Sequence, residues 1–182
     1  SDKNSNQIRS RRPENVGSFI GEYKLRRTDR EVTDAQKMKA ILDRCKIVSY
    51  AMWDGKKPYA VVMNFGYEFT PEGKLRLYSH SALEGKKVSI ICGICNKAAA
   101  IMECGERVVI DPEIPCKSGS AFQSIMASGT MKILQGSEAR HALEVFYRHQ
   151  TGVVPPFPEG AENFVTMFCL ECDEYTCKIC VK

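Results

Sequence analysis

Short runs of hydrophobic residues, many of them alternating with polar residues, recur along this chain with the two-residue spacing of β-strands. Such runs, rich in valine, isoleucine and aromatic residues and bounded by turn residues, predict about seven strands. The predicted strands span residues 47–53, 59–65, 75–79, 98–104, 107–110, 124–134 and 164–170. The turn Asp54-Gly55 separates the first two strands, and Thr70-Pro71-Glu72-Gly73 precedes the third. Because such turns are typical of hairpins, we expect these three strands to form an antiparallel meander.

Three other stretches repeat their apolar residues at the 3.6-residue spacing of a helix. The first runs from Thr33, its expected N-cap, to Cys45, and the second from about Leu83 to Cys92. The third, Ser137–Gln150, is expected to be capped by Ser137 and to end at Gly152. The strands do not alternate strictly with helices. The order of elements therefore favours a mainly β fold, an antiparallel barrel with peripheral helices, over a doubly wound parallel sheet.

Composition divides the chain into three parts. A basic, irregular N-terminal segment (residues 1–28) precedes a barrel domain (29–168), and a cysteine-rich tail (169–182) follows it. The net charge of +4 depends heavily on the N-terminal segment, and no basic face with interleaved aromatic residues, as in nucleic-acid-binding proteins, follows it. No apolar run approaches the 18 residues of a membrane span, and the N-terminus has no apolar signal core. We therefore expect a cytoplasmic protein without nucleic-acid or membrane partners.

The stretch LRLYSHSALEGKKV (residues 75–88) carries the clearest functional signal. A strand ends here in Ser79-His80-Ser81, and a helix with Lys86 and Lys87 in its first turns follows. Serine hydroxyls, a lysine and the N–H groups of a helix start all favour a bound phosphate. His80 would then lie beside whatever carries that phosphate.

Several blocks of the sequence, in order, resemble a known family. The blocks are RRTDREV (26–32), PYAVVMNFGYE (58–68), LYSHSALEGK (77–86) and, more loosely, YRHQTG (147–152). They are similar to those of the flavin-binding split barrels, the pyridoxamine 5′-phosphate oxidase-like superfamily. Within it they most resemble the nitroimidazole-resistance (Nim) group.

The resemblance implies a homodimeric split β-barrel that binds FMN at the subunit interface. It implies that Val61, Val62, Met63 and Asn64 line the flavin ring, that Ser81 and Lys86 hold the phosphate, and that Ser124 faces the cofactor. It also implies an active-site role for His80, and an imidazole suits acid–base chemistry near pH 7. A plain barrel strand would show the same pattern at 61–63, and Lys87 is as basic as its neighbour. His141 and His149 are interpreted as surface or dimer-contact residues.

Two CxxC pairs in the tail depart from the family. Four thiolates suit zinc or an iron–sulfur cluster, which makes Cys169, Cys172, Cys177 and Cys180 candidate metal ligands. The spacing between the pairs is short for a zinc knuckle, and strand alternation would put Cys169 and Cys172 on opposite faces. Free thiols at a chain end are the competing interpretation, and no metal is expected. A third CxxC, Cys92–Cys95, is interpreted as structural.

These features lead to one main functional hypothesis and two alternatives. The main hypothesis is an FMN-dependent oxidoreductase that takes electrons from a donor such as NAD(P)H. It would pass them to a small acceptor, for example a nitroaromatic or quinone-like compound, while the flavin supplies the chemistry. The alternatives are a non-enzymatic flavin or haem binding protein on the same fold, and a metal-binding module built on the C-terminal cysteines.

Overall fold

A seven-stranded antiparallel sheet forms the body of the protein. The computed structural model describes residues 27–181, so the basic segment predicted for residues 1–28 lies almost wholly outside the described residues. The strands are β1 (Ile47–Trp53), β2 (Pro58–Asn64), β3 (Gly66–Phe69), β4 (Leu75–Ser81), β5 (Lys97–Val109), β6 (Gly119–Ile133) and β7 (Thr166–Cys180). Their order in the sheet is β2-β1-β5-β6-β7-β4-β3. The predicted mainly β, antiparallel fold is confirmed.

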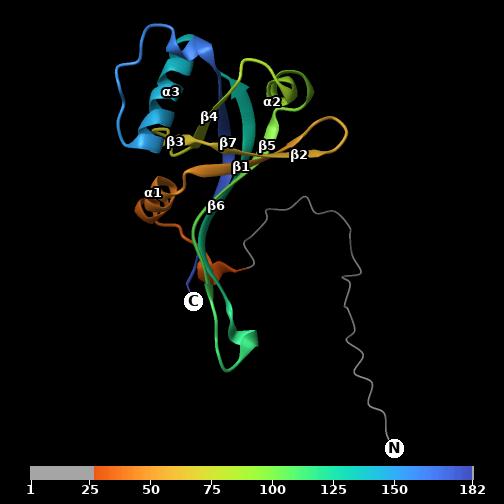
Figure 1. Cartoon of the computed structure of the whole chain (residues 1–182), viewed down its shortest axis with the longest axis vertical. Helices are drawn as coiled ribbons and strands as arrows, with labels where there is room; N and C mark the ends of the chain where they lie inside the picture. Colours follow the sequence, from red (N-terminus) through yellow and green to blue (C-terminus); the bar gives the residue numbers. More distant parts are fainter. Residues whose placement is uncertain (1–26, 182) are drawn as a thin grey trace, which may run out of the picture.

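Three helices pack around this sheet (Figure 1). They are α1 (Ala35–Arg44), α2 (Lys86–Ser89), which continues as a π-helical turn (Ile90–Ile94), and α3 (Gly136–Thr151). The predicted N-cap residues of α1 and α3 are wrong. Asp34, and not Thr33, accepts the Lys37 backbone N–H at the start of α1, and Gln135 precedes α3 without a side-chain cap. Gly152 ends α3 as predicted, because its φ of 82° suits glycine.

The curled sheet encloses the main core. Val48, Tyr50 and Met52 are buried on one face of β1, while the residues between them are exposed. The buried side chains of α1 cover one end of this core. A second apolar cluster lies on the opposite face of β4 and β7, where α3 packs.

The predicted meander of three strands is wrong. β1 and β2 form the expected hairpin, but β4 pairs with β3 and β7 and not with β2. The strand β3, which the sequence pattern did not predict, occupies the expected position of β2 beside β4. β2 approaches β4 at one end only, where the Ser79 hydroxyl donates to the Asn64 carbonyl at 2.9 Å.

The last strand is longer than predicted. The pattern placed its end at Leu170 and a cysteine-rich tail beyond it, but β7 continues to Cys180. β7 pairs with β6 over nearly its whole length and with β4 near its start. A bulge opposite Gly129 accommodates the extra residue of β7. A Cβ atom at Gly129 would lie 1.9 Å from the Glu171 carbonyl oxygen, so only glycine fits there.

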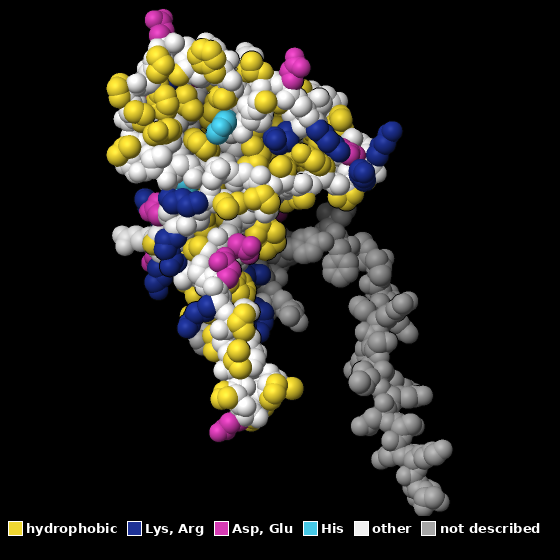
Figure 2. Space-filling model, in the orientation of Figure 1, with side chains coloured by type: hydrophobic (Ala, Val, Ile, Leu, Met, Phe, Trp, Pro, Cys, Tyr) yellow, Lys and Arg dark blue, Asp and Glu magenta, His cyan; other side chains and the backbone are white. Residues whose placement is uncertain are grey.

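β5 and β6 extend beyond the body of the protein as a two-stranded arm (Figure 1). The sequence predicted two separate strands at 98–104 and 107–110, and the structure joins them in β5 with an irregularity between Cys104 and Arg107. Large aliphatic side chains near the tip of the arm are exposed, among them Val108, Ile110 and Ile114. Figure 2 shows hydrophobic side chains on the surface of the arm, at the end of the molecule opposite α3.

Candidate functional site

The candidate site lies where β2 and β4 diverge. β3 pairs with β4 only as far as Tyr78, so within residues 27–181 the edge of β4 from Ser79 to Ser81 has no partner strand on that side. β2 pairs with β1 on one side and has no partner on the other among the described residues. Two strand edges with unpaired backbone groups therefore adjoin a single gap, which is closed at one end by the Ser79–Asn64 hydrogen bond. Such edges can hydrogen-bond to a planar ligand with polar edges.

Buried hydrogen bonds hold this corner of the site together. The Ser79 hydroxyl donates to the Asn64 carbonyl, so the Tyr50 hydroxyl, 3.0 Å away, donates to Ser79. Burial raises the pKa of Tyr50 well above its usual range, which keeps the phenol protonated as this arrangement requires.

His80 lies at the open edge of β4 with an unsatisfied nitrogen. Its ring meets Phe146 of α3 edge-on, with a centroid distance of 4.7 Å. Its Nδ1 atom is buried and has no hydrogen-bond partner, a state shared by only one other side-chain atom of the described residues, Oε1 of Gln123. Burial also lowers the pKa of His80, so the ring is neutral near pH 7. An orphaned buried nitrogen of this kind is costly unless a ligand satisfies it.

The two predicted phosphate ligands have other partners in this structure. The Ser81 hydroxyl donates to the Ala82 carbonyl at 3.0 Å. Nζ of Lys86 lies 2.7 Å from Oδ2 of Asp54 and 4.6 Å from the centre of the Tyr59 ring. The hydrogen bond from Lys86 keeps the pKa of Asp54 well below its usual range. An ammonium group has three donors, and the Lys86 side chain is half exposed, so it can still bind an anion.

The residues of β2 that were predicted to line the flavin ring do not all point the same way, because alternate residues of a strand face opposite sides of the sheet. Val61 and Met63 are partly buried against the main core, whereas Val62 points outward and is 64% exposed. The Asn64 side chain donates to the Lys46 carbonyl and to the Gln150 side chain. Only the outward side chains and the free backbone edge of β2 can therefore contact a ligand outside the barrel.

Ser124 does not lie near His80 within one chain. Ser124 pairs with Lys178 of β7, whereas His80 pairs with Met167 of the same strand. These two β7 residues are eleven positions apart, which corresponds to roughly 36 Å along a strand. One chain alone therefore does not bring the predicted residues together.

The other two histidines already have hydrogen-bond partners. His149 is partly buried, and its Nε2 lies 2.7 Å from the Cys45 carbonyl oxygen, to which it must donate. The interpretation of His149 as a surface or dimer-contact residue stays a prediction, although its side chain is only partly exposed. His141 is exposed, as expected, and its Nε2 lies 2.8 Å from the Glu68 carboxylate.

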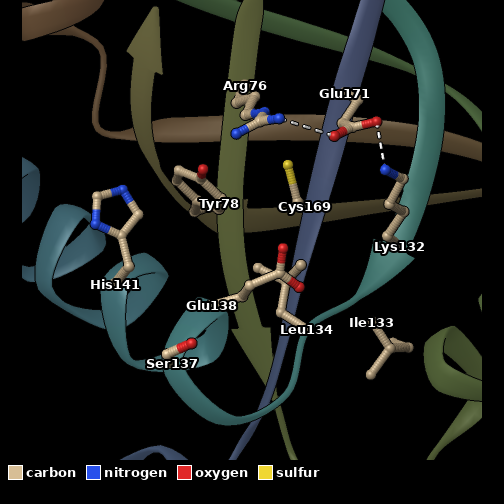
Figure 3. A pocket seen from close by; sticks show the side chains of 10 residues that line it. All are labelled: Arg76, Tyr78, Lys132, Ile133, Leu134, Ser137, Glu138, His141, Cys169 and Glu171. Atoms are coloured by element: carbon tan, nitrogen blue, oxygen red, sulfur yellow. Dashed lines mark hydrogen bonds and ion pairs between the residues drawn. The ribbon is translucent and has the colours of Figure 1, made fainter. Parts of the chain in front are cut away.

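Apart from the gap between β2 and β4, a cavity of about 280 Å³ lies between the start of α3 and strands β4, β6 and β7 (Figure 3). Its rim is a ladder of alternating charges, in which Glu171 bridges Arg76 at 3.2 Å and Lys132 at 2.6 Å. Of the predicted site residues only Cys169, a candidate metal ligand, lines this cavity, and none of the predicted flavin ligands does. Because Arg76, Glu171 and Lys132 already pair with one another, we interpret the ladder as a cross-strand support of the sheet.

The four C-terminal cysteines do not converge on one point. Cys169 is buried in the cluster beneath α3, whereas Cys172 and Cys177 are buried in the main core on the other face of β7. Among the described residues no group of histidine, cysteine, aspartate or glutamate side chains has the arrangement of a metal site. The described part of the chain also contains no helix long and apolar enough to span a membrane.

Comparison with known proteins places this fold in a class. No family model and no curated protein matches the sequence, but solved structures do. A Bacteroides thetaiotaomicron protein described as a 5-nitroimidazole antibiotic resistance protein superimposes with a TM-score of 0.68 at 26% identity, over 82% of this chain and 86% of that one. The chain thus has the fold of the flavin-binding split barrels, the pyridoxamine 5′-phosphate oxidase-like superfamily, and a Nim-like protein is among its structural neighbours.

Two further neighbours share the fold at lower identity. One is an FAD and heme binding protein from Mycobacterium smegmatis, with a TM-score of 0.70 at 16% identity over 84% of this chain and 74% of that one. The other is the flavocytochrome Anf3 from Azotobacter vinelandii, with a TM-score of 0.68 at 17% identity over 87% of this chain and 73% of that one.

Proposed function

We propose that this protein binds FMN at the gap between β2 and β4 and acts as an oxidoreductase. The observation that carries the proposal is the orphaned, buried Nδ1 of His80 at the open edge of β4, in a fold whose structural neighbours include flavin-binding proteins. The isoalloxazine ring of a flavin has polar edges that can satisfy this nitrogen and the unpaired backbone of β2.

The residues present fit such a ligand. The free edge of β2 and the neutral His80 ring would orient the flavin, and the half-exposed Lys86 would neutralise its phosphate. When bound, the flavin would supply the electron-transfer chemistry. Asp54 competes with a phosphate for Lys86, so phosphate binding requires the ammonium group to be shared or the ion pair to open.

Titration of the apoprotein with FMN and with riboflavin tests the phosphate assignment, because riboflavin lacks the phosphate. A hydrogen bond to a charged group contributes about 1.5–3 kcal/mol, so Lys86→Met is expected to weaken FMN binding by roughly 10- to 100-fold. Riboflavin binding should be unchanged. Lys87→Met is the matched control and should bind both ligands normally. Equal losses for both ligands would place Lys86 away from the phosphate, and absence of any flavin binding by the wild type would refute the proposal as a whole.

We also propose that two copies form a homodimer with the cofactor at their interface. Val62, Ile101 and Met126 align in one row across β2, β1, β5 and β6, and they are 64%, 43% and 47% exposed. Exposed apolar rows of this size commonly mark an interface. Light scattering should give the mass of a dimer, and Ile101→Lys should give a monomer. The same substitution at the exposed Val153, in the loop after α3, should leave the dimer intact; a wild-type monomer would contradict the proposal.

For the activity we propose transfer of electrons from a nicotinamide nucleotide to a small oxidised acceptor, such as a nitroaromatic or quinone-like compound. Under anaerobic conditions, NADH or NADPH should bleach the absorbance of the bound flavin, and a nitroaromatic should restore it. A flavin that stays oxidised with both nucleotides would instead favour a binding protein without turnover.

Haem binding is the alternative to flavin binding, and the same purified protein can be tested for both. Two of the structural neighbours are named for both flavin or FAD and haem or cytochrome. His149 donates through Nε2 to a backbone carbonyl, whereas Nδ1 of His80 has no partner, so His80 is the better placed haem ligand of these two histidines. A Soret band in the purified protein, lost in His80→Phe, would support haem; its absence after incubation with haemin would remove this alternative.

A further inference from the structure

Three cysteines from separate elements meet where α1 ends against the root of the arm. Cys45 caps the C-terminus of α1, Cys104 is the last residue of β5 before its irregularity, and Cys177 lies on β7. The Ile41 carbonyl oxygen accepts the backbone N–H of Cys45 at 3.1 Å and the thiol of Cys104 at 3.9 Å. Cys45 and Cys104 therefore lie beside the same carbonyl group. None of these residues belongs to the candidate flavin site.

The three thiols differ in access. Cys45 and Cys177 are buried in the main core, and burial raises the pKa of both, that of Cys177 to about 11. Cys104 is only partly buried, so it is the thiol that a small molecule from solvent can reach. All nine cysteines of the described chain are free. A reachable thiol beside a buried one has the arrangement of an attacking and a resolving cysteine.

We propose that Cys104 and Cys45 form a reversible disulfide when the protein meets a peroxide. In the first step the Cys104 sulfur attacks one peroxide oxygen, the O–O bond breaks, and Cys104 becomes a sulfenic acid while water or an alcohol leaves. In the second step the Cys45 sulfur attacks the Cys104 sulfur, an S–S bond forms, the S–O bond breaks, and water leaves. Each peroxide thus accepts two electrons from the two thiols. A small thiol reverses the reaction by exchange.

Cys45 is the expected partner because its backbone N–H and the Cys104 thiol donate to the same oxygen, the Ile41 carbonyl, which places the two residues side by side. Among the described residues no such shared hydrogen bond joins Cys177 to Cys104. The bond would join the end of α1 to β5 at the point where the arm leaves the body. Oxidation would therefore fix the position of the arm relative to α1.

Peptide mapping of the full chain after treatment with hydrogen peroxide tests the proposal. Cys92 and Cys116, the two exposed thiols of the described chain, are first replaced by serine to prevent links between molecules. After treatment, alkylation and digestion without reductant, we expect two fewer alkylated thiols and one peptide that links Cys45 to Cys104. Dithiothreitol should abolish both changes.

Two variants distinguish this bond from its alternatives. Cys104→Ser should keep all its remaining thiols free, and Cys177→Ser, the matched control, should still form the link. A Cys104–Cys177 peptide, or oxidation of Cys104 to a sulfinic acid without any link, would overturn the proposal. Because the link is sought first in the protein with the core cysteines intact, the result does not depend on the folding of either variant.

Discussion

Replacing His80 with phenylalanine should move stability and flavin binding in opposite directions. Phenylalanine keeps the edge-on contact with Phe146 but has no nitrogen at the position of Nδ1. In the apoprotein the substitution removes a buried, unsatisfied polar atom. In the flavin complex it removes the group that we expect the ligand to satisfy.

The magnitudes follow from the cost of an unsatisfied buried group, about 1–3 kcal/mol. The apoprotein should gain up to that amount on His80→Phe. For a domain of this size each kcal/mol shifts the melting temperature by about 2–4 °C, so we expect a rise of roughly 2–12 °C. Loss of the hydrogen bond to the ligand should weaken flavin binding by roughly 5- to 150-fold.

Thermal unfolding of flavin-free protein and a fluorescence titration with FMN measure the two effects separately. Flavin must be removed first, because bound ligand itself raises the melting temperature. His141→Phe is the control, since that ring is exposed and lies outside the proposed site. An apoprotein that melts lower, together with unchanged FMN affinity, would refute the reasoning that the Nδ1 atom of His80 awaits a ligand.

Three further outcomes concern the fold around the site. Gly129→Ala should destabilise the protein by about 1–3 kcal/mol or more in denaturant titrations, because its Cβ would meet β7, whereas Gly93→Ala, with nothing within 4 Å, should be tolerated. Tyr50→Phe leaves the Ser79 hydroxyl with one partner fewer and should cost about 1 kcal/mol in the same assay. Burial lowers the folded-state pKa of His149, so the unfolded chain binds more protons below about pH 6.5, and stability should fall as the pH drops through that value. His149→Gln should flatten this part of the pH profile.

The sequence pattern predicted the strands of the barrel well where their pairing is local. β1 and β2 are joined by a short turn, and Asp54 accepts hydrogen bonds from the backbone within it, so alternation and turn residues were sufficient. The course of β7 beyond Leu170 depends instead on pairing with β6. Residues 171–178 mix acidic, basic and cysteine side chains, and their hydrophobic pattern alone does not indicate a strand. The hydrophobic pattern of a segment does not show which distant segment it pairs with.

The same distinction applies to the site. His80 and the two lysines after it were identified from a strand, a turn and a helix start, which are features of one short segment. The contact of His80 with Phe146 and the ion pair of Lys86 with Asp54 join segments far apart in the sequence. The competition between Asp54 and a phosphate for Lys86 could therefore be recognised only in the structure.

The position of Ser124 bears on whether the site is shared between two chains. If Ser124 faces a flavin, as the family resemblance implies, the roughly 36 Å that separate its β7 partner from that of His80 mean that it faces the flavin of the other subunit. Each site of a two-fold dimer would then combine His80 of one chain with Ser124 of the other. We therefore expect mixed dimers of His80→Phe and Ser124→Ala chains to contain one site with both substitutions and one site with neither. Such dimers, purified with two different affinity tags, should bind about one FMN per dimer with wild-type affinity, although each parent homodimer binds weakly. If both sites of the mixed dimer bind weakly, or if the Ser124→Ala homodimer binds normally, Ser124 does not belong to the partner's site.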